Sequence, residues 1–308
     1  MAQLLQVRRV AKGYRRSFIS APHKVLTSID LNLRRGEVAG LYGANGSGKT
    51  TLTRLLVGLT NQDDGDIQVL GLPPSQALKA GLIGYVPERE RLPGYMTPSS
   101  MLRVRRRGTP RDIDQQWVDF LHETLGLDGL MHRPVRELSK GQRQRISILL
   151  AIAPLPPLII MDEPTDGLDP VSRVRVKDII RALSQRNIGV LMNSHLVDET
   201  QSACESYAIL HGGTIKERGR SESLRSEVSS WMIALTADGN DLQEARQILQ
   251  LPEADERGFM KAPASNLEEL NAFIEQARSH KLLLSALEPE RHPIEDKLAA
   301  FSVGECKE

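Results

Sequence analysis

The stretch EVAGLYGANGSGKTTLTRLL, residues 37–56, decides the fold of this chain. Its first six residues are mostly apolar and predict a short buried strand. Residues 50–59, TTLTRLLVGL, place apolar side chains at helical spacing and predict an amphipathic helix. The glycine-rich segment GANGSGKT, Gly43 to Thr50, connects the two. A buried strand, a glycine-rich turn and a helix in this order indicate an α/β fold.

The connecting segment matches the pattern G-x-x-x-x-G-K-[ST] of a phosphate-binding loop, or P-loop. Its glycines allow the tight turn that directs successive backbone N–H groups at phosphate oxygens. Lys49 places a positive charge at the β- and γ-phosphates, and the Thr50 hydroxyl can ligate Mg²⁺. The helix that begins at Lys49 adds the favourable field of its N-terminus. We therefore predict a site for ATP with Mg²⁺.

A second motif, LIIMDEP at residues 158–164, ends a buried strand in two carboxylates. Asp162 is expected to hold Mg²⁺ directly or through water, as the Walker B aspartate does. Glu163 follows at once and can polarise the water that attacks the γ-phosphate. An acidic turn after a core strand is common on its own, so this assignment depends on the P-loop.

Strand and helix patterns divide the chain into two parts. Up to about residue 225 buried strands alternate with helices, which indicates a parallel sheet, and residues 89–150 are mostly helical. Residues 231–301 predict a strand–helix–strand–helix–strand unit with one further helix. We therefore expect a large domain at residues 1–225 and a small separate domain at residues 226–308.

Composition and charge argue against several classes of protein. Forty basic and 39 acidic residues give a net charge of +1, so we expect no nucleic-acid partner. The two cysteines, Cys204 and Cys306, form no CxxC pattern and favour neither a disulfide framework nor a zinc site. The most apolar run, residues 146–161, is broken by prolines and does not predict a membrane span. The arginine-rich segment 103–111 is either a solvated helix face or a patch that meets a partner or anionic lipid headgroups.

Four further motifs resemble those of ATP-binding cassette (ABC) ATPases. LSKGQRQR, residues 138–145, resembles their signature sequence and precedes LIIMDEP at the spacing typical of the family. GLDP, residues 167–170, is similar to their D-loop, and His195 in NSH to their switch histidine. Tyr14 is similar to the aromatic residue that stacks on adenine. The resemblance covers about residues 3–225.

The resemblance implies a fold class and a set of site residues. The fold is expected to be an α/β P-loop NTPase with a mostly parallel sheet core, an antiparallel N-terminal β subdomain, a helical subdomain and a small C-terminal α+β domain. Glu163, His195 and Glu88 are the expected catalytic residues, and Thr50, Glu88 and Asp162 the expected metal ligands. The expected cofactor-binding residues are Tyr14, Gly43, Ala44, Asn45, Gly46, Ser47, Gly48, Lys49, Thr50, Thr51, Ser139, Gly141, Gln142 and Asp169.

Two positions depart from the usual family pattern. Glu88, in GYVPE, stands where the Q-loop usually carries glutamine, and Lys140 stands where glycine is commoner in the signature. Both residues resemble those of a subset of exporter-type cassettes. A carboxylate at position 88 can still coordinate Mg²⁺ or its water. Neither change removes a group that hydrolysis needs, so we expect an active ATPase.

The chain carries one P-loop and one signature, which has consequences for its partners. In the family the signature reaches the γ-phosphate of the opposite subunit, so the resemblance implies a head-to-tail homodimer with two composite sites. It also implies a separate integral membrane permease docked near residues 88–107, and a peripheral location on the cytoplasmic face of the membrane. The segment PIEDKLAAF, residues 293–301, resembles dimer-stabilising or regulatory tails of exporter-type cassettes.

The expected function is therefore ATP hydrolysis that drives export through the permease. A soluble cassette ATPase with a regulatory or mechanical role is the alternative. A kinase built on the same P-loop would need an acceptor site and a lid, and the sequence suggests neither. No residue is assigned to cargo, because cargo specificity in such systems lies in the permease.

Overall fold

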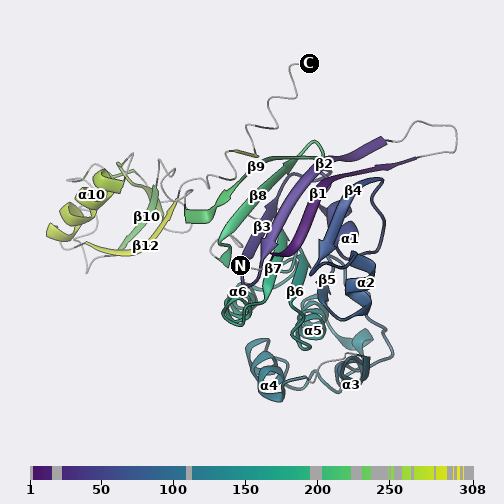
Figure 1. The fold of residues 1–308 in the computed structure, drawn as a ribbon. Coiled ribbons are helices and arrows are strands. Elements are labelled where there is room, and N and C mark those ends of the chain that lie inside the picture. The colour runs from purple at the N-terminus through teal and green to yellow at the C-terminus, as the bar shows by residue number, and fades with distance from the viewer. Residues whose placement is uncertain are drawn as a thin grey trace. The chain divides into compact units, whose positions relative to one another are not determined.

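In the computed structural model the chain forms two compact units, residues 1–221 and 222–308 (Figure 1). The residues that the structure describes are 3–15, 23–108, 113–194, 203–222, 231–236, 249, 251–252, 259–264, 267–280, 282–289, 294, 297–298 and 301.

The first unit begins with an antiparallel sheet of three strands in the order β2-β1-β4. Its strands are β1 (Gln3–Tyr14), β2 (His23–Arg34) and β4 (Asp64–Val69). Buried and exposed residues alternate along β2, as expected for a sheet with one face on the core. This sheet is the predicted antiparallel N-terminal subdomain.

A six-stranded sheet in the order β5-β6-β7-β3-β8-β9 forms the centre of the unit. All neighbouring pairs are parallel except β8 and β9. The strands are β3 (Val38–Tyr42), β5 (Ile83–Val86), β6 (Leu158–Asp162), β7 (Gly189–Ser194), β8 (Ser206–His211) and β9 (Thr214–Arg220). Every residue of β3, β6 and β7 is buried, because both faces of a parallel sheet are covered. The predicted mostly parallel core is confirmed.

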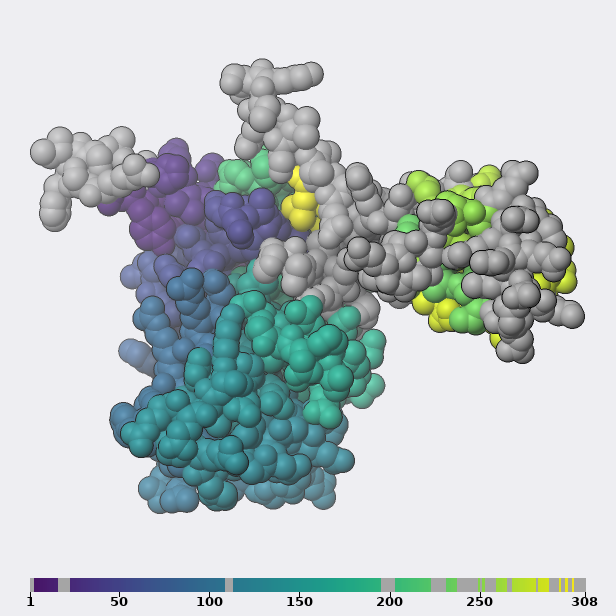
Figure 2. Space-filling view, turned by 180° about the vertical axis from the view of Figure 1, so that it is seen from behind, coloured from purple at the N-terminus to yellow at the C-terminus, as the bar shows by residue number. Residues whose placement is uncertain are grey.

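Helices complete the first unit. They are α1 (Lys49–Leu56), α2 (Pro74–Lys79), α3 (Pro98–Gly108), α4 (Gln115–Thr124), the 3₁₀ turn η1 (Val135–Glu137), α5 (Lys140–Ile152) and α6 (Pro170–Gln185). Helices α3 and α4 lie at the end of the unit far from β1, β2 and β4 (Figure 1). The space-filling view shows this helical part in teal as a continuous block opposite the purple N-terminal strands (Figure 2).

The helical part is joined to the rest of the unit by a buried aromatic residue. Trp117 of α4 is only 1% exposed, and its ring nitrogen donates to the carbonyl of Ile152 at 3.1 Å. The ring stacks on Phe120, and the guanidinium of Arg186 lies 4.5 Å from its centroid. This side chain therefore links α4 to the end of α5 and to the residue after α6.

Two details differ from the sequence-based prediction. The helix predicted over residues 50–59 ends at Leu56, because Gly58 adopts a left-handed φ of 73°. A Cβ at Gly58 would lie 2.5 Å from the backbone nitrogen of Ser75, so the chain turns there against α2. Strands β8 and β9 were not predicted. In the part of the chain that the structure describes, no helix has the length and apolar character needed to cross a bilayer.

The second unit contains an antiparallel sheet in the order β11-β10-β12 and the helix α10. Its elements are β10 (Trp231–Thr236), β11 (Met260–Lys261), α10 (Leu267–Ser279) and β12 (Leu283–Pro289). Alternate residues of β10 are buried and form a separate core with Phe273 and Ala277 of α10. The predicted helix at residues 241–251 lies largely outside the described residues, and the last one is described only at 294, 297–298 and 301.

Candidate nucleotide-binding site

The P-loop connects β3 to α1 and requires glycine at specific positions. Gly46 and Gly48 have φ of 83° and 108°, a left-handed backbone that favours glycine. A Cβ at Gly43 would lie 2.4 Å from the carbonyl oxygen of Leu210 and 2.6 Å from Oγ of Ser47. The Ser47 hydroxyl is buried and has no hydrogen-bond partner among the described residues. The loop thus has the glycine-dependent turn that the motif predicts, with a polar group available to a ligand.

Lys49, at the start of α1, is buried inside the loop. Its ammonium donates to the carbonyl of Gly43 and, at 3.2 Å, to that of Ala44. Burial lowers the pKa of Lys49, while the carboxylates of Glu163, Asp162 and Glu88 oppose that shift. The lysine and the three predicted carboxylates therefore share one electrostatic environment.

Asp162, the last residue of β6, is 2% exposed. Its Oδ1 accepts a hydrogen bond from the side-chain amide of Asn193 at 3.3 Å, while its Oδ2 has no partner among the described residues. Burial raises the pKa of Asp162, Glu163 and Glu88 add to the rise, and Asn193 and Lys49 counteract it. A buried carboxylate oxygen without a partner is costly unless a cation or donor meets it in the working state.

Asn193 of β7 is a residue of this site that the sequence analysis did not single out. Its side-chain amide nitrogen donates to Asp162 and also to the hydroxyl of Thr53 on α1, and its backbone carbonyl accepts the backbone N–H of Glu163 at 3.0 Å. It therefore ties β7 to β6 and to the P-loop helix. The available signal was a polar pair, Asn193 and Ser194, that ends the apolar run GVLM.

Glu163 and Glu88 approach the site from neighbouring strand ends. Glu163 has a φ of 49°, which is unusual for a residue with a side chain and turns the chain sharply after β6. Glu88 follows β5 after one intervening residue, is 46% exposed and lies 4.0 Å from the guanidinium of Arg89. Strands β5 and β6 are parallel neighbours, so both carboxylates emerge at the same edge of the sheet.

The signature residues form the first turn of α5. Ser139 is its N-cap: the serine hydroxyl accepts the N–H of Gln142 at 3.2 Å, and the glutamine side chain accepts the N–H of Ser139 at 2.9 Å. This is a capping box. A Cβ at Gly141 would lie 3.0 Å from the carbonyl oxygen of Gly167, and Lys140 pairs with Asp166 at 2.7 Å. Signature and D-loop are therefore packed against each other.

Asp169 is the N-cap of α6. Its carboxylate accepts the N–H and the hydroxyl of Ser172 at 2.9 and 2.6 Å, and these hydrogen bonds lower the pKa of Asp169. Between described residues, no hydrogen bond or ion pair joins Ser139–Gln142 or Asp169 to the P-loop of the same chain. The structure brings the P-loop, Asp162, Glu163 and Glu88 together and leaves these two helix caps without such a bond to them.

Tyr14 and His195 are the two other residues that the sequence predicts for the site. Tyr14 ends β1 with 41% of its surface exposed, and the ammonium of Lys12 lies 5.5 Å from its ring centroid. His195 lies outside the described residues.

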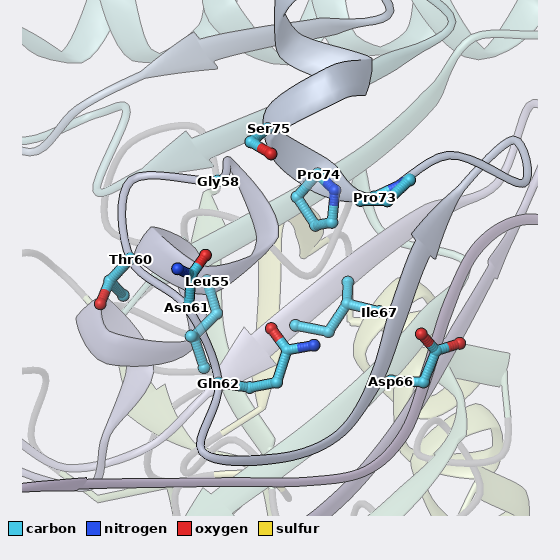
Figure 3. A pocket seen from close by; sticks show the side chains of 10 residues that line it. All are labelled: Leu55, Gly58, Thr60, Asn61, Gln62, Asp66, Ile67, Pro73, Pro74 and Ser75. Carbon is cyan, nitrogen blue, oxygen red and sulfur yellow. The ribbon is translucent and has the colours of Figure 1, made fainter.

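A separate hollow of about 260 Å³ lies on another part of the unit (Figure 3). It is lined by residues from the end of α1, the loop after it, β4 and the start of α2, with Leu55, Ile67 and Pro74 among them. None of the predicted site residues lines it.

Comparison with known proteins identifies the family. The family model described as "ABC transporter" matches residues 26–166. The lipopolysaccharide export system ATP-binding protein LptB of Haemophilus influenzae is 34% identical over 233 residues, which cover 73% of this chain and 93% of that protein. The chain belongs to the ABC transporter ATP-binding family. The predicted family, the P-loop NTPase fold and the ATPase activity of an ABC transporter subunit are thereby confirmed.

A further relative and two solved structures of ABC proteins are also similar to this chain. The Nod factor export ATP-binding protein I of Cupriavidus metallidurans is 32% identical, with 81% of each chain covered. The solved ATP-binding subunit of an ABC transporter superposes with a TM-score of 0.65 at 26% identity, covering 73% of this chain and 92% of that one. A dimeric cassette in a post-hydrolysis state with ADP and Pi superposes with a TM-score of 0.63 at 20% identity, over 71% of this chain and 99% of that one, and shows the shared fold.

Proposed function

We propose that this cassette hydrolyses Mg·ATP at two sites shared between two copies of the chain, and that it drives export through a separate membrane permease. The LptB and Nod factor relatives are both ATP-binding proteins of export systems. The observation that carries the hydrolysis part of the proposal is the buried Oδ2 of Asp162, which has no partner among the described residues and whose carboxylate interacts with the P-loop lysine.

The residues present fit a divalent cation. Asp162 offers an unpaired buried oxygen, Thr50 a half-buried hydroxyl at the start of α1, and Glu88 a carboxylate at the same sheet edge. These are the oxygen ligands that Mg²⁺ prefers. When bound, Mg²⁺ would neutralise charge that develops on the phosphate oxygens.

The protein's own groups supply the rest of the chemistry. The P-loop N–H groups and Lys49 bind the β- and γ-phosphates, and Tyr14 stacks on adenine. Glu163 accepts a proton from the attacking water, and His195 contacts the γ-phosphate. The left-handed backbone at Glu163 supports this role, because strained backbone conformations concentrate at functional sites.

The second half of each site comes from the partner copy. Ser139, Gly141 and Gln142 stand at a helix N-terminus, where backbone N–H groups favour an anion. They have no bond to the P-loop of their own chain among the described residues. A head-to-tail dimer places them on the γ-phosphate bound by the other copy, with Asp169 at the interface.

The surface that meets the permease is proposed to lie at residues 88–107, as in the sequence analysis. Tyr95 is 79% exposed and Val104 61% exposed there. The four arginines of α3 are all exposed and form no ion pair with a described residue; they are Arg103, Arg105, Arg106 and Arg107. Exposed aromatic residues and arginines are both enriched at protein interfaces. Docking there would place the cassette at the cytoplasmic face of the membrane.

One experiment tests the chemistry. Purified protein should hydrolyse ATP only when Mg²⁺ or Mn²⁺ is added. Asp162→Asn should keep binding ATP without metal, measured by equilibrium dialysis, and lose the increase in affinity that Mg²⁺ gives to the parent. If Asp162→Asn hydrolysed ATP at the parent rate, the assignment of this carboxylate would be wrong.

A second experiment separates the transport subunit from a soluble regulatory or mechanical ATPase. A tagged chain expressed in its own host should co-purify with an integral membrane protein in detergent. Val104→Asp should lose that partner and keep its ATPase rate. Val174→Asp, at a valine of α6 that is 56% exposed, is the matched control and should keep both. Full activity with no integral partner in any preparation would favour the soluble alternative.

A further inference from the structure

Lys12 and Asp63 form a small polar cluster beside the ring of Tyr14. The ammonium of Lys12 lies over that ring, 5.5 Å from its centroid, and donates to Oδ1 of Asp63 at 2.6 Å. The other oxygen of the same carboxylate accepts the backbone N–H of Gly13 at 2.7 Å. The Asp63 carboxylate therefore holds both the Lys12 ammonium over the ring and the backbone of Gly13, the residue before Tyr14.

The carboxylate is itself anchored to the sheet. The backbone N–H of Asp63 donates to the carbonyl of Ala11 at 2.9 Å, and the next residue, Asp64, pairs with Ala11 in the β1–β4 ladder. Lys12 keeps only 13% of its side-chain surface exposed, against 51% for Asp63. The lysine is therefore held against the ring instead of extending into solvent, where a lysine side chain would retain its conformational freedom.

The end of β1 is also fixed relative to the P-loop. Lys12 pairs with Leu26 across the β1–β2 ladder. Gly48, the N-cap of the P-loop helix, lies against that same strand: a Cβ there would be 2.6 Å from Cδ2 of Leu26 and 3.2 Å from the carbonyl of Val25. A base extending from phosphates held at the P-loop would therefore meet a ring whose position is set by β2.

A cation on one face of an aromatic ring is attracted by the ring's negative quadrupole and restricts the ring's rotation. Tyr14 keeps 41% of its surface exposed, which leaves ring surface for a second stacking partner. We propose that Lys12 and Asp63 are positioning residues that hold the Tyr14 ring ready to stack on the adenine base of ATP. The inference rests on the proposed stacking role of Tyr14 and extends it to two residues with no assigned role.

The test separates the contribution of the adenine base to ATP binding from that of the phosphates. KM for ATP is compared with the inhibition constant of magnesium tripolyphosphate, which has the phosphates and lacks the base. Lys12→Met should raise KM for ATP about fivefold, since a cation–aromatic contact of this exposure is worth about that factor. The kcat and the inhibition constant of tripolyphosphate should stay as in the parent. Asp63→Asn should shift KM in the same direction.

Controls distinguish positioning from general damage to the fold. Lys12→Arg keeps a cation over the ring and should restore most of the affinity for ATP. Lys79→Met removes an exposed lysine at the end of α2 and should change nothing. Melting temperatures of all variants should stay within a few degrees of that of the parent, since the Asp63 side of the ion pair is half exposed and such pairs contribute little to stability.

The outcomes also separate this inference from the proposed function. Tyr14→Ala should raise KM for ATP, and Lys12→Met added to it should raise KM no further, because both act through one ring. If Tyr14→Ala raises KM and Lys12→Met does not, the positioning role is overturned while the stacking role stands. If Lys12→Met weakens the binding of ATP and of tripolyphosphate equally, Lys12 acts on the phosphates and the positioning role is again overturned. If Tyr14→Ala leaves KM unchanged, the stacking role fails and the inference fails with it.

Discussion

Glu163 combines two unusual properties for a single residue: a left-handed backbone and a charge that acts on two other ionisable groups of the site. Its φ of 49° costs conformational energy for any residue with a Cβ. Its backbone N–H is held by the carbonyl of Asn193 at 3.0 Å, and its charge acts on both Lys49 and Asp162. The backbone is thus fixed by a neighbouring strand, and the carboxylate is directed by the turn.

Glu163→Gln should abolish ATP turnover, by about a hundredfold or more, while ATP still binds, because an amide cannot accept the proton of water. The variant should form a dimer when ATP is added, seen as a doubled mass in light scattering. Glu123→Gln, at an exposed position in α4, is the matched control and should behave as the parent. Turnover of Glu163→Gln at the parent rate would show that another group is the base.

The carboxyl group of Asp63 leads to a prediction about how the stability of the fold depends on pH. The hydrogen bonds from Lys12 and from the N–H of Gly13 lower the pKa of Asp63 below its ordinary value of 3.8. A carboxyl group with a lowered pKa in the folded state stabilises the fold above its unfolded pKa, and that contribution is lost as pH falls through the folded value. Asp63→Asn should therefore lower the melting temperature slightly at pH 7, and the difference from the parent should shrink below about pH 4. The effect is small because the group is half exposed.

At the scale of elements, the N-terminus of α5 carries two roles in one residue. Ser139 caps the helix through a reciprocal bond with Gln142, and it is proposed to meet the γ-phosphate of a partner copy. A serine cap is worth about 1 kcal/mol of stability. Capping and phosphate binding can be separated, because aspartate also caps a helix well and carries a negative charge.

Ser139→Ala should therefore lose about 1 kcal/mol of unfolding free energy and most of the ATPase activity. Ser139→Asp should keep the stability of the parent in chemical denaturation, yet lose ATP-driven dimerisation, because its carboxylate repels the phosphate. If Ser139→Asp hydrolysed ATP normally, the residue would be a helix cap only.

Elements with strong local patterns were predictable, and those without were missed. β3, α1, β6 and α6 follow from apolar runs and helical spacing in the sequence. The early end of α1 could not be predicted, because it depends on the close approach of Gly58 to the backbone of Ser75. β9 was missed because none of its residues is fully buried, and its pairing with β8 is what makes it a strand. β8 is an exception, since it was missed although it is buried from Tyr207 to His211.

At the scale of the whole molecule, the chain has two units with separate hydrophobic cores. Residues of β10 and α10 form their own cluster, distinct from those around the six-stranded sheet. We propose that the second unit, as the sequence analysis suggested, is an accessory domain that stabilises the dimer. The predicted boundary near residue 225 and this role both stay predictions.

Removal of residues 222–308 tests that role. The remaining chain should fold and bind ATP with the affinity of the parent, because the P-loop and its carboxylates lie in the first unit. In the Glu163→Gln background, the dissociation constant of its ATP-dependent dimer should be at least about tenfold higher than that of the full-length dimer. The reason is that a second contact between the two copies raises the effective concentration of the first. Equal dimer affinity with and without the second unit would contradict the role.

The sequence by itself determined the strand–loop–helix of the P-loop, the acidic end of β6 and the serine cap of α5. Each of these depends on residues within a few positions of one another, where sterics and hydrogen bonding act locally. The tertiary structure alone decided that Asn193 joins Asp162 to Thr53, and that Asp63 holds Lys12 against Tyr14 from 51 positions away. These contacts follow from strand order and register, which bring distant residues together and leave no periodic pattern along the chain.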